Sequence, residues 1–108
     1  MANSFSSDVL IQAQDPKSAA AFYAEELGFT VTAEAPHLVS VHGPSINFFI
    51  EQGPVIGPVL EVAVPDVSAA KHRLIAAGCA VIKDEPHVPR CYIRDPYGLT
   101  FNLIKATS

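Results

Sequence analysis

The sequence predicts an α+β fold of two tandem βαβββ modules that form a curved mixed sheet around a cleft. Three observations predict it: the chain matches itself when shifted by fifty residues, each copy has the same order of elements, and a short segment joins them. The chain has 108 residues, the length of one small domain. We therefore expect a single domain with module one at 1–52, a linker at 53–58 and module two at 59–108.

The internal repeat is strongest over residues 18–37. Seven of these twenty positions are identical after the shift, whereas roughly one in fifteen is expected by chance. The matched residues of the first copy are Ser18, Ala19, Ala20, Gly28, Val31, Pro36 and His37. Periods of this length usually mark repeat arrays, but only two copies fit here, so we interpret them as a duplicated module.

Each copy begins with a short β-rich run, at 9–13 and 60–64, followed by a helix. Asp15 and Asp66 are predicted as helix N-caps, and Gly28 and Gly78 stand where helices end in a left-handed residue. Three extended segments follow in each copy, at about 29–34, 38–42 and 45–51, and at 79–83, 90–94 and 99–105. One helix covers only one face of such a sheet, which leaves the other face for the second copy, a partner chain or a ligand.

Composition and charge exclude several classes of partner. The net charge is −4 at pH 7, and no basic patch exists to neutralise a row of phosphates, so nucleic acid is not expected. No apolar run approaches the roughly 20 residues that span a bilayer, and the first residues lack a secretion signal. Two cysteines are too few for a disulfide scaffold. We therefore expect a cytoplasmic protein that contacts neither nucleic acid nor membrane.

Three segments resemble the glyoxalase / bleomycin resistance / extradiol dioxygenase superfamily, also called vicinal oxygen chelate proteins. Residues 15–23, followed by Leu27-Gly28-Phe29, resemble its first-helix signature, and residues 66–70 with 76–78 resemble the counterpart in the second module. The segment 94–103, RDPYGLTFNL, is similar to the hairpin before the last strand and is the most specific. The resemblance covers nearly the whole chain and implies the same two-module fold.

The resemblance also implies a divalent metal, held by the first and last strands of each module, that polarises substrate oxygens or binds dioxygen. The four ligand positions fall on Asp8, Phe48, Val59 and Asn102, and a one-residue slip on the first strands would remove Asp8. Valine and phenylalanine have no donor atom and asparagine is a weak ligand, whereas zinc and transition metals take three or four N, S or O ligands. We therefore expect neither the usual metal nor another cofactor.

Strand alternation predicts which side chains face away from the helices. The expected lining of a small-molecule pocket is Asp8, Gln12, Phe48, Glu61, Tyr92, Arg94 and Asn102. Three interpretations of Glu61 stay open: an edge residue in water, a carboxylate that contacts a cationic ligand or acts as a base, or a metal ligand. Asp8 is alternatively a solvated residue at a strand start. Tyr92 and Arg94 either contact a ligand, by stacking and by binding an anion, or serve packing and turn geometry.

These inferences predict a small-molecule-binding protein of the superfamily that lacks the catalytic metal and acts in drug or toxin sequestration, as antibiotic resistance proteins do. We assign no catalytic residue. A homodimer is expected because the chain is small and one sheet face is uncovered. One alternative is a metal-dependent lyase, isomerase or dioxygenase of the same superfamily with a rearranged metal centre. Another is an interaction module whose cleft is only core.

Overall fold

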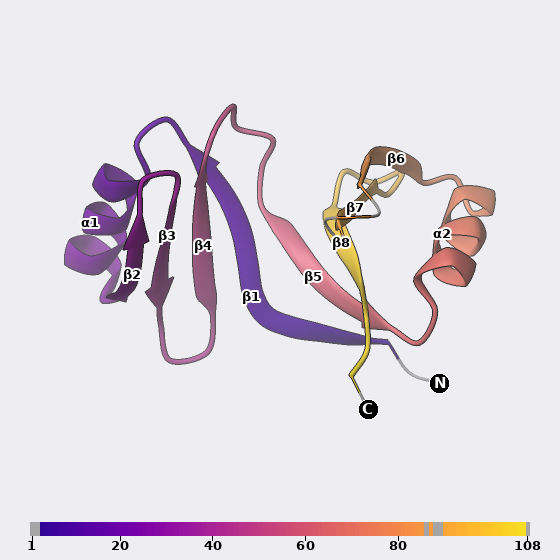
Figure 1. Ribbon diagram of the computed structural model, residues 1–108, viewed down its shortest axis with the longest axis horizontal. Helices are drawn as coiled ribbons and strands as arrows, with labels where there is room; N and C mark the ends of the chain where they lie inside the picture. The colour runs from indigo at the N-terminus through magenta and orange to yellow at the C-terminus, as the bar shows by residue number, and fades with distance from the viewer. Residues whose placement is uncertain (1–2, 86, 88–89, 108) are drawn as a thin grey trace. The chain divides into compact units, whose positions relative to one another are not determined.

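The computed structural model describes residues 3–85, 87 and 90–107 and confirms the α+β class and the βαβββ order of both copies (Figure 1). The first copy contains β1 (Ser4–Ala13), α1 (Pro16–Leu27), β2 (Thr30–Ala35), β3 (Leu38–His42) and β4 (Asn47–Gln52). The second contains β5 (Val59–Val64), α2 (Val67–Ala76), β6 (Ala80–Glu85), β7 (Arg90–Arg94) and β8 (Thr100–Lys105). No helix in this part of the chain is long and apolar enough to cross a membrane.

The chain divides into two compact units. Residues 7–58 form the first, which we call module one, and the described residues after 58 form the second, module two, together with residues 3–6. Strand β1 begins at Ser4, five residues before the predicted start, so its first residues belong to module two. The sequence conceals this start because its serines lack the β-branched or aromatic character typical of strands.

In module one, the strands lie in the order β2-β3-β4-β1, with β1 parallel to β4 and the other pairs antiparallel. Helix α1 covers one face of this sheet (Figure 1). The core beneath the helix contains Ala20 of α1, Val39 and Val41 of β3, and Ile50 of β4. Since all four side chains are at most 1% exposed, this face is closed by the helix and by the aromatic rings around it.

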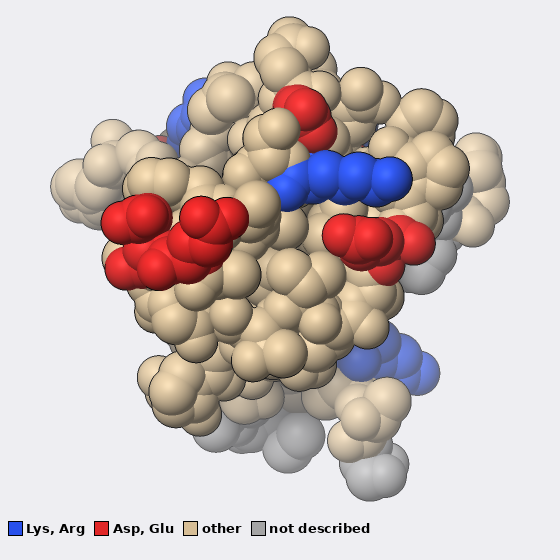
Figure 2. All heavy atoms as spheres, turned by 90° about the vertical axis from the view of Figure 1, so that its left-hand side faces the viewer, with Lys and Arg blue, Asp and Glu red and all other residues tan. Residues whose placement is uncertain are grey.

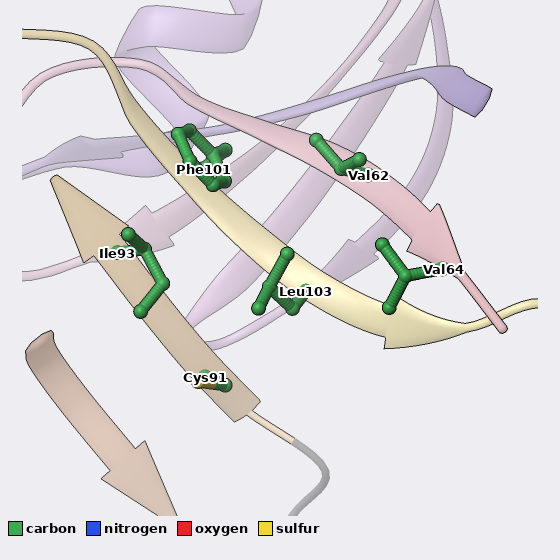
Figure 3. Packing of buried hydrophobic residues seen from close by; sticks show 6 residues of the cluster. All are labelled: Val62, Val64, Cys91, Ile93, Phe101 and Leu103. Atoms are coloured by element: carbon green, nitrogen blue, oxygen red, sulfur yellow. The ribbon is translucent and has the colours of Figure 1, made fainter. Parts of the chain in front are cut away.

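In module two, the order β5-β8-β7-β6 repeats the same pairing pattern, with β5 parallel to β8. Figure 3 shows the buried side chains of its core along three adjacent strands: Val62 and Val64, Phe101 and Leu103, Cys91 and Ile93. Side chains of α2, among them Val67, Ala70 and Leu74, pack against this cluster. The even or odd position of a residue in each strand therefore decides whether it faces α2 or the opposite side.

The predicted N-caps of both helices are confirmed. The Asp15 carboxylate accepts hydrogen bonds from the Ser18 backbone N–H at 3.2 Å and the Ser18 hydroxyl at 2.8 Å, which lower the pKa of Asp15. The Asp66 carboxylate accepts one from the Ala69 N–H at 3.1 Å. Each cap satisfies a backbone donor of the first turn that has no partner within the helix.

Helix α2 is shorter than α1, 10 residues against 12, and this alters the register of the repeat. The caps Asp15 and Asp66 are 51 positions apart (66 − 15), whereas the positive-φ glycines Gly28 and Gly78 are 50 apart (78 − 28). Within the helices, the spatial equivalent of Ser18 is therefore Ala69 and not Ser68. The one-residue slip considered for the first strands is excluded, because Ile11 and Ala13 pack against the module one core as Val62 and Val64 do in module two, which makes Asp8 equivalent to Val59.

Figure 2 shows the α1 side of the molecule with its charged side chains. Acidic side chains lie in separate groups on this face, and basic side chains lie between or beside them. The chain as a whole carries 11 acidic and 7 basic residues, not counting histidine. In this view the charges therefore form a surface of mixed sign and not a continuous basic patch.

Candidate functional site

Four of the predicted site residues come together on one face of module two. The registers pair Glu61 of β5 with Asn102 of β8, and Asn102 with Tyr92 of β7. These three side chains form a row across adjacent strands, on the face opposite the core under α2, because their neighbours Val62, Leu103 and Ile93 belong to that core. We call this row and its neighbours the Glu61 face.

The next row of the Glu61 face holds the fourth predicted residue. Arg94 of β7 pairs with Thr100 of β8, and its Nε donates a hydrogen bond to the Thr100 hydroxyl at 3.0 Å. Arg90 lies on the same side, with its guanidinium carbon 5.6 Å from the centre of the Tyr92 ring. Cation–π contact and a cross-strand hydrogen bond thus fix these side chains.

Asn102 makes a local hydrogen bond that orients its amide. Its Oδ1 accepts from the backbone N–H of Cys91 at 2.9 Å, so the NH2 group points away from that contact. No described residue accepts a hydrogen bond from this NH2 group. Asn102 therefore presents donors, and not its carbonyl oxygen, to any molecule on the Glu61 face.

Glu61 carries the charge of the row. Its side chain is half-buried, and it makes no hydrogen bond or ion pair with another described residue. A partly desolvated carboxylate without a partner favours contact with a cation or a hydrogen-bond donor. The Glu61 face therefore combines an acceptor, the amide donors of Asn102, an aromatic ring and a guanidinium group within three strands.

The two polar residues predicted from module one are already bound within that module. Asp8 accepts a hydrogen bond from the Asn47 amide at 2.8 Å across β1 and β4. The Oε1 atom of Gln12 accepts from the backbone N–H groups of Ile56 and Gly57, at 2.9 and 3.1 Å, and so ties the linker to β1. The Nε2 atom of Gln12 is buried without a hydrogen-bond partner among the described residues.

Substitution of Gln12 by alanine is expected to release the linker from β1. The Oε1 atom of Gln12 accepts both hydrogen bonds from the linker, so the substitution removes both. Amide hydrogen exchange at Ile56 and Gly57 should become about tenfold faster, as the loss of about one net hydrogen bond implies. Exchange measured by NMR tests this. Gln14→Ala is the control, because the Gln14 side chain is exposed; equal exchange in the two variants would contradict the assignment.

The predicted orientation of Phe48 is wrong. Its ring faces α1, stacked on Phe29 with centroids 4.9 Å apart and tilted against Tyr23 at 5.2 Å. The register explains this, since Phe48 pairs with Val9 and so shares its face of the sheet. Asp8 pairs with Asn47 as its equivalent Val59 pairs with Thr100, so Asn47 and Thr100 are equivalent. Two residues further along each strand, the equivalent of Asn102 is therefore Phe49 and not Phe48.

The residues at the family's ligand positions do not fit a divalent metal. Module one supplies Asp8 and Phe49, and one Asp8 oxygen already accepts from Asn47. Module two supplies Val59 and Asn102, and the Asn102 oxygen accepts from Cys91. The described residues also contain no group of three or more His, Cys, Asp or Glu side chains suited to a metal. Two hydrocarbon side chains and two engaged oxygens leave too few donors for such a centre.

The surroundings of Cys91 do not favour a nucleophile. Both thiols are free, Cys91 buried and Cys79 partly buried. Burial raises the pKa of the Cys91 thiol, and the neighbouring Asp84 carboxylate raises it further. Lys71 lies nearby but pairs with Asp84 at 2.6 Å. A buried thiol with a raised pKa stays protonated at neutral pH, which disfavours nucleophilic attack.

Fold and sequence together define a protein of the glyoxalase type. Residues 8–104 match the family model of the glyoxalase-like domain, so this chain belongs to that family. The resemblance inferred from the helix and hairpin motifs is thereby confirmed. No curated protein matches the sequence.

Solved structures share this fold at low identity. A glyoxalase/bleomycin resistance protein/dioxygenase superfamily member from Vibrio splendidus is 16% identical with a TM-score of 0.67, over 95% of this chain and 100% of that one. A hypothetical protein from Bacillus halodurans is 13% identical with a TM-score of 0.70, over 100% and 97%. Homoprotocatechuate 2,3-dioxygenase from Brevibacterium fuscum is 18% identical with a TM-score of 0.63, over 93% of this chain and 35% of that one. These likenesses show the fold alone.

Proposed function

We propose that this protein binds a small organic ligand on the Glu61 face of module two, without the divalent metal of catalytic relatives. One observation carries the proposal: the half-buried Glu61 carboxylate has no partner among the described residues and lies in one row with Asn102 and Tyr92. Membership of the glyoxalase-like family supports it, because the superfamily binds small ligands.

The chemistry of the row indicates the kind of ligand. A protonated amine or another donor would contact Glu61, and an acceptor on the same molecule would bind the Asn102 NH2 group. The Tyr92 ring is 4% exposed and has the Arg90 guanidinium over it, so it packs beneath the row and offers little surface for stacking. The proposed ligand is therefore a small amphipathic molecule with a cationic or donor group.

Sequestration accounts for this chemistry better than metal-dependent turnover does. The ligand positions of the family hold Phe49 and Val59, which have no donor atoms, and Asn102, whose oxygen is engaged. A binder needs only affinity, which the Glu61 carboxylate and the Asn102 amide of the row would supply. The same proposal includes a role in drug or toxin resistance. It also includes a homodimeric state, which mass measurement in solution would test.

Glu61→Gln is expected to weaken binding of a small amphipathic amine about tenfold, because a charge-assisted hydrogen bond contributes roughly 1.5–3 kcal/mol. Thermal shift would select the tightest compound from paired sets of small amphipathic amines and acids of equal size, and calorimetry would then give its affinity. Glu34→Gln on β2 is the control, because this exposed carboxylate belongs to module one. Equal affinity of wild type and Glu61→Gln would contradict the proposal.

Metal analysis of protein purified without chelators separates this function from the enzymatic alternative. We expect far less than one metal ion per chain. Stoichiometric zinc, nickel, iron or manganese, lost from Asp8→Ala or Glu61→Ala, would favour the lyase, isomerase or dioxygenase with a rearranged centre. Such a result would overturn the metal-free binder.

A further inference from the structure

We propose a second binding site in module two, for a molecule with an apolar body and a carboxylate head. It is a cavity of about 530 Å³ bounded by α2, by strands β5 and β8, and by the start of β1. Its floor contains Val62, Val64, Phe101 and Leu103, whose side chains form the core under α2 (Figure 3). The cavity therefore lies on the side of the sheet opposite the Glu61 face.

The internal repeat explains why space remains there. In module one, four aromatic rings contact one another: Tyr23, Phe29 and Phe48 pack against the core under α1, and the exposed Phe22 contacts Tyr23. Their equivalents in module two are found by counting from the N-caps for the helix residues and from Gly28 and Gly78 for Phe29. The strand registers give the equivalent of Phe48, because Phe48 pairs with Val9 as Phe101 pairs with Leu60. The equivalents in module two are Arg73, Leu74, Cys79 and Phe101.

Module two thus keeps one of the four rings. Three of the four equivalents, Arg73, Leu74 and Phe101, line the cavity. Helix α2 does not compensate with other large side chains, since alanines 69 and 70 face the space and no residue of α2 is buried. Fewer rings over an apolar floor leave a volume within the range of roughly 300–1,000 Å³ that small-molecule pockets occupy.

Two charged residues on the lining indicate the polarity of the occupant. The Asp66 carboxylate is engaged as the N-cap of α2. The Arg73 guanidinium, exposed at the rim, makes no hydrogen bond or ion pair with another described residue. Seven residues separate them, about 10 Å along a helix, so an anion at Arg73 would stand well away from Asp66.

A carboxylate with an apolar tail satisfies both features. Its head would pair with the fork-shaped donors of Arg73, which match a carboxylate, and its tail would lie along the apolar lining to which Val64 and Leu103 belong. At Glu61 the preference is the opposite, because a carboxylate favours a cation. Glu61 and Arg73, on opposite faces of this sheet, therefore favour ligand groups of opposite charge.

Decanoate is a suitable probe, with the neutral decanol as its matched partner. We expect saturable binding of decanoate that shifts the methyl resonances of Val64 and Leu103 and leaves the Tyr92 ring resonances unchanged. Arg73→Gln should lower the affinity for decanoate about tenfold, because the charge-assisted contact is lost. The affinity for decanol should not change. Lys17→Gln removes a lysine from α1, outside the lining, and should change neither.

Four results would overturn this site. No saturable binding of decanoate would show that the space is not accessible or is filled by another part of the chain. Equal decanoate affinity in wild type and Arg73→Gln would show that Arg73 does not bind the carboxylate head. The third result is a wild-type dimer that does not bind decanoate and that Ala69→Phe converts to monomers. It would identify a second copy of this chain as the occupant. Shifts at Tyr92 without shifts at Leu103 would place decanoate on the Glu61 face instead and also overturn the proposal, while amine binding tests that face independently.

Discussion

Replacing Ile93 by alanine is expected to lower the free energy of unfolding by about 3 kcal/mol, within the range of roughly 2–5 kcal/mol for such truncations. The side chain is 0% exposed and belongs to the module two core, among residues of three strands. Removing it takes apolar atoms out of contact and leaves a void, because packed strands relax only partly. Urea denaturation followed by circular dichroism would measure the loss.

Ile75→Ala provides the matched control. It deletes the same atoms from α2, where the side chain is 45% exposed, and its cost should stay below about 1 kcal/mol. The comparison therefore separates burial from side-chain identity. Similar losses in the two variants would show that Ile93 is less tightly packed than its place in the core indicates.

Replacing Phe48 by alanine is expected to destabilise the protein by about 3 kcal/mol and to leave ligand affinity unchanged. The ring contacts Phe29 and Tyr23 beneath α1, so its loss opens the core of module one. Phe49→Ala, at the neighbouring position on the other face of β4, is the control, and its effect on stability should be smaller. Denaturation and calorimetry on both variants give stability and affinity separately.

The opposite outcome for Phe48 would restore the first interpretation of the strand. If Phe48→Ala retained full stability but lost ligand binding, the ring would belong to a binding surface and not to the core under α1. Reduced stability with unchanged binding is the result that the register of β1 and β4 requires.

Much of the fold could be predicted because its signals are local. The caps Asp15 and Asp66 bond to backbone groups three residues further along the chain, and Gly28 ends α1 with φ of 79°. Such hydrogen bonds and backbone angles depend on neighbouring residues, which a single sequence displays. The row of Glu61, Asn102 and Tyr92 was also predictable, since isolated polar residues in apolar strands fix the phase of the alternation.

The misplacement of Phe48 has the converse cause. The run Ile46–Ile50 is apolar except for Asn47, so an alternation of period two has almost no phase there, and both orientations of a phenylalanine fit it. Gln12 was beyond prediction for another reason. Its partners in the linker, Ile56 and Gly57, lie 44 and 45 positions away, and such contacts exist only after the chain has folded.

The unequal helices of the two modules also bear on how the duplicated halves diverged. Successive residues of an α-helix point about 100° apart, so a one-residue offset turns an aligned side chain toward a different neighbour. Tyr23 and Arg73 coincide in the linear repeat, yet the caps make Arg73 the counterpart of Phe22. Consider a chimera in which α1 replaces α2. If the two helices were aligned by sequence identity, the chimera would bury the wrong face of the transplanted helix. If they were aligned by their N-caps, it would place aromatic rings in the cavity of module two.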